Sequence, residues 1–260
     1  MPVLFLPQDT LMKKTLLLIT ALLGAVTLTG CSNTLDPVTG ERNDPLQGFN
    51  RTMWDFNYKV LDPYLLKPAA KGWDALPAPL TTGLSNVADN LDEPVSFVNR
   101  LWEGEGQKAM VHLNRFIINS TFGLGGLIDW ASYSDPLKIE HQRTFGDTLG
   151  SYGVNPGTYI VLPVYNATTP RELTGAAVDS AYTYPFWHWV GGAWSLAKYG
   201  VQAVDNRAKA MDKEALLEQA TDPYITFREA YYQNLEYRAT DGNVKAKESG
   251  LSEEDLNSID

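Results

Sequence analysis

Cys31 is the only cysteine in the 260-residue chain, and it directly follows a segment with the layout of a bacterial secretory signal. Lys13 and Lys14 precede an apolar run at 16–28, which leads into the string Leu-Thr-Gly-Cys at 28–31. A basic start, an apolar middle and small residues at the cleavage point are typical of such signals. A single thiol cannot form an intramolecular disulfide. The Leu-x-Gly-Cys pattern instead predicts a diacylglyceryl lipid on Cys31, and we expect a lipid-anchored mature protein.

Two details of this leader bear on the location of the mature protein. Met12 is a better start than Met1, because a leader that begins there is compact. Where lipoproteins are sorted by the residue after the cysteine, aspartate retains them at the inner membrane. Ser32 therefore favours the outer membrane, on the periplasmic side of its inner leaflet. The expected divisions are a signal peptide at 1–30, a lipidated tether at 31–43, a helical domain at 44–240 and a disordered acidic tail at 241–260.

The other residues that can do chemistry form no recognisable catalytic or metal-binding motif. The sequence has no G-x-S-x-G elbow, H-E-x-x-H pair, C-x-x-C pair or P-loop. Asp92 and Glu93 precede a predicted helix, where adjacent carboxylates are expected to act as caps rather than as an acid–base pair. Glu140-His141 is the strongest remaining pair. We expect no enzyme, no metal and no cofactor beyond the lipid, while a site assembled from distant residues stays open.

The charge balance excludes one class of partner. Residues 31–260 contain 19 basic and 30 acidic residues, which gives a formal charge of −11. Nucleic-acid binding needs clustered lysine and arginine for phosphate contacts, and the sequence has no basic run. No stretch after Cys31 approaches the ~18–20 continuous apolar residues of a bilayer-spanning helix. Further contact with a membrane would require amphipathic helices that lie in its plane or pack on one another.

Helical spacing of apolar residues predicts that most of the domain is α-helical. The first helix begins at Asp44-Pro45, a cap followed by a first-turn proline, and is expected to end near Leu61 because of Asp62-Pro63. Its broad apolar arc fits either a helix inside a core or one that faces lipid. Further helices are expected at about 79–90, 94–102, 107–120, 126–131, 171–181, 189–211 and 223–238.

Two regions differ from this helical pattern. Five aromatic residues gather at 182–189, where they would form either a belt at the level of lipid headgroups or part of the core. Between 145 and 165, glycines recur, and a short β-like run at 159–162 ends at Pro163. We expect a mobile Gly-rich loop there with one small strand pair.

Several strings of the mature chain resemble those of the MlaA/VacJ lipoprotein family. They are Asp-Pro-Leu-Gln-Gly-Phe-Asn-Arg at 44–51, Val-Leu-Asp-Pro-Tyr at 60–64, Gly-Leu-Ser-Asn at 83–86, Asn-Leu-Asp-Glu-Pro at 90–94, Asn-Arg-Phe at 114–116 with residues 119–126, Arg-Thr-Phe-Gly-Asp-Thr-Leu-Gly at 143–150 and Asp-Pro-Tyr-Ile-Thr-Phe-Arg-Glu-Ala at 222–230. They occur in order over nearly the whole mature chain and are specific in combination. The resemblance implies an all-α fold, with amphipathic helices in a ring-like single domain in the inner leaflet and a short β-hairpin near 150–165.

The resemblance also implies a function. Members of that family surround an amphipathic channel, associate with trimeric outer-membrane porins and pass mislocalised outer-leaflet phospholipids to a soluble periplasmic carrier. It therefore implies a channel-forming domain at 44–240, a role in lipid asymmetry without catalysis, and phospholipid, porin and carrier as partners.

Three groups of residues are candidates for parts of such a channel. A flank of the 189–211 helix would line the headgroup side, with Lys198 attracting phosphate, although an ordinary solvated face has the same pattern. Gly153 and Gly157 are hinge candidates in a loop that resembles the family's glycine-containing segment. Asn155-Pro156 occupies positions that are more flexible in some relatives, which bears on how far this loop moves. The flank comprises Lys198, Gln202, Asp205 and Lys209, and the gating candidates in the first helix are Asp55, Phe56, Asn57 and Tyr58.

Two functions of other classes stay open on the sequence alone. An envelope lipid hydrolase would need a Ser/His/Asp or His/Asp cluster assembled in space. A passive scaffold lipoprotein would bind envelope proteins without extracting or passing lipid.

Overall fold

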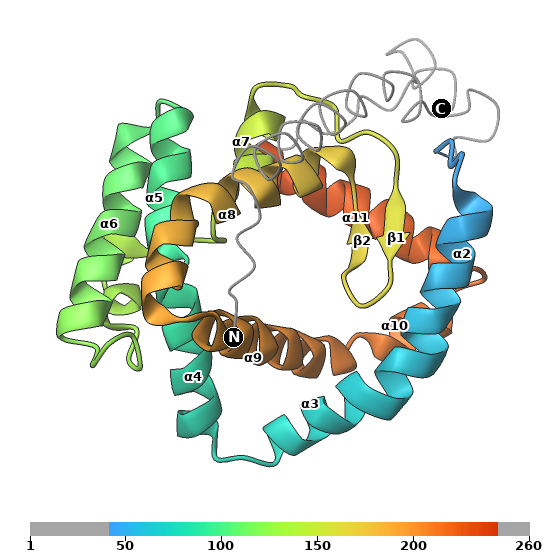
Figure 1. Cartoon of the computed structure of the whole chain (residues 1–260), viewed down its shortest axis with the longest axis horizontal. Helices are drawn as coiled ribbons and strands as arrows, with labels where there is room; N and C mark the ends of the chain where they lie inside the picture. Colours follow the sequence, from blue (N-terminus) through green and yellow to red (C-terminus); the bar gives the residue numbers. More distant parts are fainter. Residues whose placement is uncertain (1–41, 244–260) are drawn as a thin grey trace, which may run out of the picture.

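The structure, a computed structural model, describes residues 42–243, and their helices form a ring-like single domain (Figure 1). Cys31, the predicted signal peptide and most of the predicted tether and tail lie outside these residues. At the two ends of the described part, Arg42 bonds to Glu229 at 3.2 Å and Asp241 pairs with Arg100 at 2.7 Å. The elements are α2 (Gln47–Phe56), the π-helix η1 (Asn57–Leu66), α3 (Lys67–Asp74), α4 (Ala78–Asn90), α5 (Glu93–Trp102), α6 (Gly106–Thr121), the 3₁₀ turns η2 (Trp130–Tyr133) and η3 (Asp135–Leu137), α7 (Phe145–Ser151), β1 (Ile160–Leu162), β2 (Asn166–Thr168), α8 (Pro170–Val190), α9 (Gly192–Met211), α10 (Glu214–Glu218) and α11 (Pro223–Ala239).

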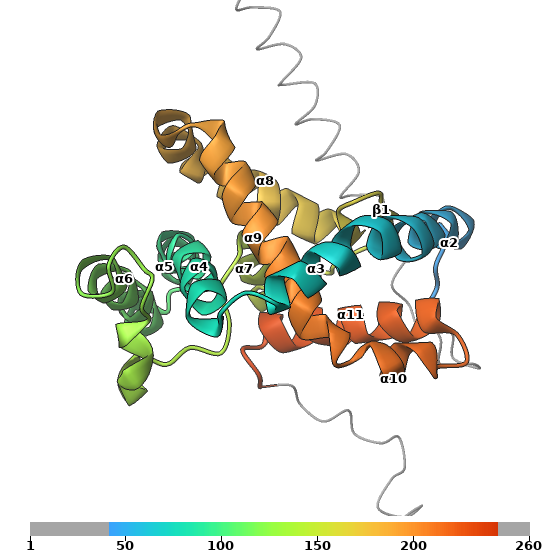
Figure 2. The same cartoon turned by 90° about the horizontal axis from the view of Figure 1, so that it is seen from below.

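Contacts between distant segments hold the ring together. The first arm, made of α2, η1 and α3, contacts α9 through α3 and contacts the hairpin through β1. Elsewhere α5 packs on α6, and α7 packs on α8. Seen from the side, the end where α8 meets α9 rises above the ring, and α9 descends across it to α10, which lies with α11 on the other side (Figure 2). The predicted all-α ring with a short antiparallel hairpin is confirmed, with Ile160 paired to Thr168 and Leu162 to Asn166.

Polar side chains make up an unusually large share of the buried residues. Among the described residues, 20 polar or charged residues are buried against 11 hydrophobic ones, and five of those 11 are alanines. Large apolar side chains instead point outward, including Tyr64, Phe122, Trp189 and Leu196, which are between 74% and 83% exposed. Because soluble monomers rarely expose contiguous apolar surface, this distribution indicates that the exterior meets another apolar phase or partner. Among the residues described, no helix has the length and hydropathy to cross a membrane.

The small apolar core lies where α2, β1 and α11 meet. Trp54 packs against Tyr224 at 6.1 Å and Phe227 at 4.9 Å, measured between ring centroids. Tyr159 makes similar edge contacts with Tyr224 and Tyr231. This aromatic cluster fixes the base of the hairpin between the first and last helices.

The first helix does not end at Asp62-Pro63, so that prediction was wrong. The chain continues as η1, and Pro63 lies inside it. Proline removes one backbone donor and usually breaks an α-helix. The wider π winding accommodates Pro63, and the chain then returns to α geometry in α3.

Two further predictions need correction. Residues 145–151 form the helix α7 rather than a loop, because Thr144 and Asp147 make a capping box. No helix spans 126–131, because the backbone φ is positive at the three successive positions 124–126. Of the two readings left open for the aromatic residues at 182–189, which lie in the last turns of α8, exposure favours the surface for Tyr184, Phe186 and Trp189, at 62%, 44% and 83%.

Candidate functional site

The predicted headgroup flank lies on α9, where it faces the turn between α4 and α5. Lys198 is buried, and its Nζ donates to Asp92 Oδ1 at 2.8 Å and to Gln202 Oε1 at 3.2 Å. Gln202 Nε2 donates to the other oxygen of Asp92 at 2.7 Å. One carboxylate thus satisfies both residues and balances the charge of Lys198 inside the protein. Asp92 therefore does not cap a helix as the sequence predicted, and its side chain makes no cap bond.

The other two residues of the flank lie one turn further along α9. Asp205 accepts a hydrogen bond from Trp73 Nε1 at 3.1 Å and pairs with Lys209 at 2.7 Å. Burial alone would raise the pKa of Asp205, but Lys209 and its hydrogen bonds hold that pKa below its ordinary value, so Asp205 is ionised at neutral pH. The side chain of Lys209 is 68% exposed, so it is the accessible cation among the four predicted residues.

Two asparagines connect the first arm of the ring to the hairpin. Asn50 Nδ2 donates to the Tyr159 carbonyl at 2.9 Å, and Asn50 Oδ1 accepts from the Val161 N–H at 2.9 Å. Asn57 repeats this pattern three residues further along the hairpin. Its Nδ2 donates to the Leu162 carbonyl at 2.8 Å, and its Oδ1 accepts from the Val164 N–H at 3.0 Å. The two amides thus act like an extra strand beside β1, which has β2 on its other edge.

The four gating candidates divide into two faces of the arm. Asn57 is buried against the hairpin, and Tyr58 stacks on Trp54 at 5.4 Å between ring centroids. Asp55 pairs instead with Lys59 at 2.9 Å on the exposed face, with 54% of its side chain accessible. Phe56 is 41% exposed.

The two hinge candidates differ in how firmly they are held. Gly153 and Gly157 have φ of +80° and +84°, a backbone region that side chains rarely adopt. Gly153 is exposed, an added Cβ would meet no heavy atom within 4 Å, and the N–H of Gly153 donates to the Gly150 carbonyl at 2.9 Å. Gly157 is buried, its N–H donates to Asn155 Oδ1 at 2.8 Å, and its carbonyl accepts from Tyr232 Oη at 2.9 Å. Gly153 is therefore the freer of the two positions.

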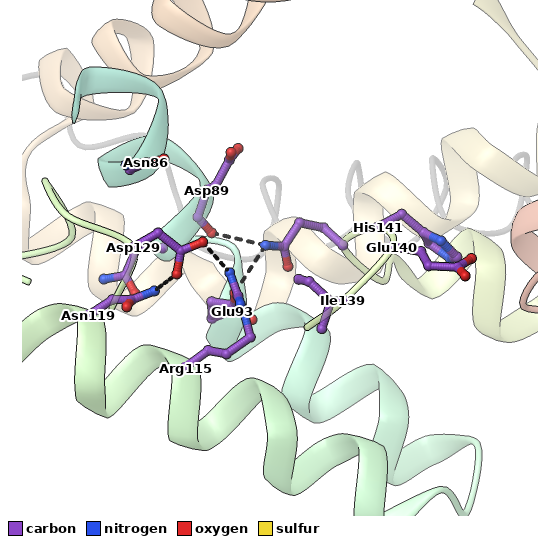
Figure 3. A pocket seen from close by; sticks show the side chains of 11 residues that line it. Asn86, Asp89, Glu93, Arg115, Asn119, Asp129, Ile139, Glu140 and His141 are labelled. Carbon is purple, nitrogen blue, oxygen red and sulfur yellow. Dashed lines mark hydrogen bonds and ion pairs between the residues drawn. The ribbon is translucent and has the colours of Figure 1, made fainter. Parts of the chain in front are cut away.

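A polar cavity of about 290 Å³ lies among α4, α5, α6 and the 139–142 segment (Figure 3). Its charged residues already bind one another. Arg115 donates to Glu93 at 2.6 Å and to Asp129 at 2.9 Å, and Asn119 donates to Asp129 at 2.8 Å. Glu93 also pairs with His112 at 2.7 Å. The lining contains no serine, threonine or cysteine, so the cavity offers no nucleophile of the hydrolase type.

Glu140 and His141 also line this cavity but bind different partners. Glu140 accepts from Tyr237 Oη at 2.6 Å, and His141 Nε2 lies 3.8 Å from Asp241. Burial lowers the pKa of His141, so the ring is neutral at pH 7. Within residues 42–243, no group of histidine, cysteine or carboxylate side chains has the geometry of a metal site.

The buried network around Glu93 was missed by the sequence reasoning, which took Glu93 for a helix cap. The available signal lies in the 107–120 helix. There His112, Arg115 and Asn119 recur at helical spacing on an otherwise apolar segment, and all three are buried. Polar residues on one stripe of such a helix indicate an interior that is polar rather than apolar.

Comparison with known proteins shows the family of the chain. The family model described as MlaA lipoprotein matches residues 42–238, nearly all of the described chain. The chain belongs to the MlaA lipoprotein family. A MlaA-family structure described as the structural basis for maintenance of bacterial outer membrane lipid asymmetry superposes with a TM-score of 0.70. It is 45% identical and covers 76% of this chain and 100% of its own.

Two family members are similar over almost their full length. The intermembrane phospholipid transport system lipoprotein MlaA of Haemophilus influenzae is 62% identical over 249 residues, which cover 95% of this chain and 100% of that protein. The protein of the same name from Escherichia coli strain K12 is 41% identical over 243 residues, covering 92% of this chain and 96% of its own.

Proposed function

We propose that this protein is an outer-membrane lipoprotein that removes mislocalised phospholipids from the outer leaflet and so maintains lipid asymmetry. The near full-length match to relatives named as phospholipid-transport lipoproteins carries the proposal. The lipid on Cys31 holds the ring at the periplasmic side of the inner leaflet. Its partners are a trimeric porin and a soluble periplasmic carrier that receives the lipid.

The distribution of side chains supports this location. Many aromatic and aliphatic side chains are exposed, and polar and charged side chains are buried between the helices. A protein in the acyl region of a leaflet needs this arrangement, because lipid tails favour apolar surface and leave buried polar groups to satisfy one another.

A phospholipid has a polar head and two apolar tails, so its path needs surfaces of both kinds. We assign the headgroup side to the α9 flank. Lys209 is accessible to an incoming phosphate, whereas Lys198 is bound to Asp92. A phosphate that reaches Lys198 must compete with that carboxylate, which favours transient rather than tight binding. Weak binding suits a passage, because lipid has to leave as well as enter.

The hairpin is the element we assign to gating. It is attached to the first arm through Asn50 and Asn57, and its connection to α7 contains Gly153 and Gly157. Movement at Gly153 would shift the hairpin while its asparagine contacts hold the other side. Replacement of Gly153 with alanine strains the backbone there and tests the hinge; unchanged transport would remove it.

Transfer of labelled lipid tests the proposal against its alternatives. The full-length lipoprotein is incorporated into vesicles that contain radiolabelled phospholipid, and the periplasmic carrier is added. We expect intact phospholipid on the carrier, and less of it with Cys31→Ala protein. Release of free fatty acid would indicate a hydrolase, and binding of envelope proteins without lipid transfer would indicate a scaffold; either result contradicts the proposal.

A further inference from the structure

The π-helix η1 is an unusual element in the first arm of the ring. A π-helix has hydrogen bonds between residues five apart, and the Lys67 N–H bonds to the Asp62 carbonyl in this register. Most π segments are a single turn, whereas η1 runs for ten residues. Within η1, the two buried residues are Asn57 and Asp62, which are five positions apart. Burial therefore follows the π period.

This winding aligns three polar residues that an α-helix would separate. An α-helix turns by about 100° per residue, so residues five apart point about 140° away from each other. In a π-helix the turn is wider, so residues five apart point in more nearly the same direction. Asn57, Asp62 and Lys67 follow one another at intervals of five, so the π winding places all three on the inward face of the arm.

Each of these three residues binds a different element. Asn57 binds the hairpin through Leu162 and Val164. Asp62 accepts two bonds from Arg207 of α9, at 2.5 Å from Nε and 2.8 Å from Nη2.

Lys67 completes the line at the junction of η1 and α3. Its Nζ donates to Glu214 of α10 at 2.7 Å, and Arg207 also lies 3.4 Å from Glu214. The opposite face of the arm is open, since Lys59, Val60 and Tyr64 are exposed. The three inward contacts thus bind the arm to three other elements at once.

We propose that Asp62 and Lys67 are positioning residues for the β1–β2 hairpin, because their ion pairs hold η1 in the π winding that turns Asn57 toward it. The role of the hairpin in transport, which this inference uses, comes from the proposed function. If η1 relaxed to α winding, Asn57 and Asp62 could not both keep their partners. The α9 and α10 side of the ring is thereby coupled to the hairpin through one helix.

The hairpin tip is suited to respond to such a change. Val164 has a φ of +69°, a left-handed conformation that is strained for a β-branched residue. Its N–H is held by Asn57 Oδ1. Loss of that acceptor removes a contact that keeps Val164 in this conformation, so the tip is the part expected to loosen first.

Hydrogen exchange at two backbone amides tests the inference. The Val164 N–H depends on Asn57 in η1, whereas the Val161 N–H depends on Asn50 in the preceding α-helix. We expect Asp62→Leu to speed exchange of Val164 by about tenfold, the effect of losing one hydrogen bond, and to leave Val161 unchanged. The measurement uses the full-length lipoprotein in detergent, with exchange followed by NMR.

Two more variants make the result specific. Lys67→Gln removes a partly exposed ion pair, retains the fold, and should speed exchange of Val164 alone by a smaller factor. Lys59→Gln removes a matched ion pair on the exposed face and should change neither amide.

Three results would overturn the positioning role. They are equal acceleration at Val161 and Val164, unchanged exchange of Val164 in both inward variants, and acceleration of Val164 in Lys59→Gln. Neither amide reports on lipid. Failure of this test therefore leaves the proposed function standing, and absence of lipid transfer leaves the exchange pattern intact.

Discussion

Replacement of Asn57 with leucine removes the link between η1 and the hairpin while nearly conserving side-chain size. It deletes the bonds to the Leu162 carbonyl and the Val164 N–H. Two neutral hydrogen bonds contribute about 1–3 kcal/mol together to the free energy of unfolding. For a domain of this size, each kcal/mol shifts the melting temperature by about 2–4 °C. We therefore expect the melting temperature of Asn57→Leu to fall by about 2–12 °C.

Asp55→Asn is the matched control for this change. It lies one half-turn earlier and its side chain is 54% exposed with a single surface ion pair, so its effect on unfolding should stay within about 0.5 kcal/mol. Thermal unfolding in detergent followed by circular dichroism compares both variants with the wild type, and outer-leaflet phospholipid is measured in cells. The reasoning is refuted if Asn57→Leu has the same melting temperature as the control and if cells that carry it keep a normal amount of outer-leaflet phospholipid.

Three further changes have defined outcomes. Gly175→Ala places a Cβ 2.3 Å from the Gly146 nitrogen, so α7 and α8 must separate; denaturant unfolding should show a loss of about 1–3 kcal/mol. Glu93→Gln removes the carboxylate that balances the buried Arg115 and should cost about 3–5 kcal/mol by the same measurement, whereas a loss below about 1 kcal/mol would show the network to be unimportant. Burial would raise the pKa of Asp147, but Arg238 holds it below its ordinary value. The contribution of Asp147 to the free energy of unfolding is thus complete above about pH 4 and is lost as the pH falls through the lowered pKa. In Asp147→Asn, the free energy of unfolding should therefore change less with pH in this acidic range.

Local signals in the sequence predicted most of the helices correctly. Asp222 followed by proline predicted the start of α11, and Asp222 Oδ1 accepts from the N–H groups of Tyr224 and Ile225 there. The ends of α4, α5 and α6 agree with the predictions to within one residue, because capping, proline and apolar spacing act over short distances.

The features that the sequence did not predict depend on long-range contacts. Asp62-Pro63 is a stop signal for an α-helix, and the π-helix found there carries bonds from Asp62 to Arg207, 145 positions later, which the local sequence does not show. Lys198 was expected to attract phosphate, yet its nearest anion is Asp92, 106 positions earlier. Helical spacing places Lys198 on a flank of α9 but cannot show which side chain meets it.

The most direct test of the proposed transport is the amount of phospholipid in the outer leaflet of a deletion strain. The strain is complemented with the wild type, with Cys31→Ala and with the surface control Asp135→Asn, whose side chain is 87% exposed. The account predicts that phospholipid accumulates in the outer leaflet on deletion, that wild type and control restore the normal level, and that Cys31→Ala does not. Normal outer-leaflet phospholipid in the deletion strain would contradict the account.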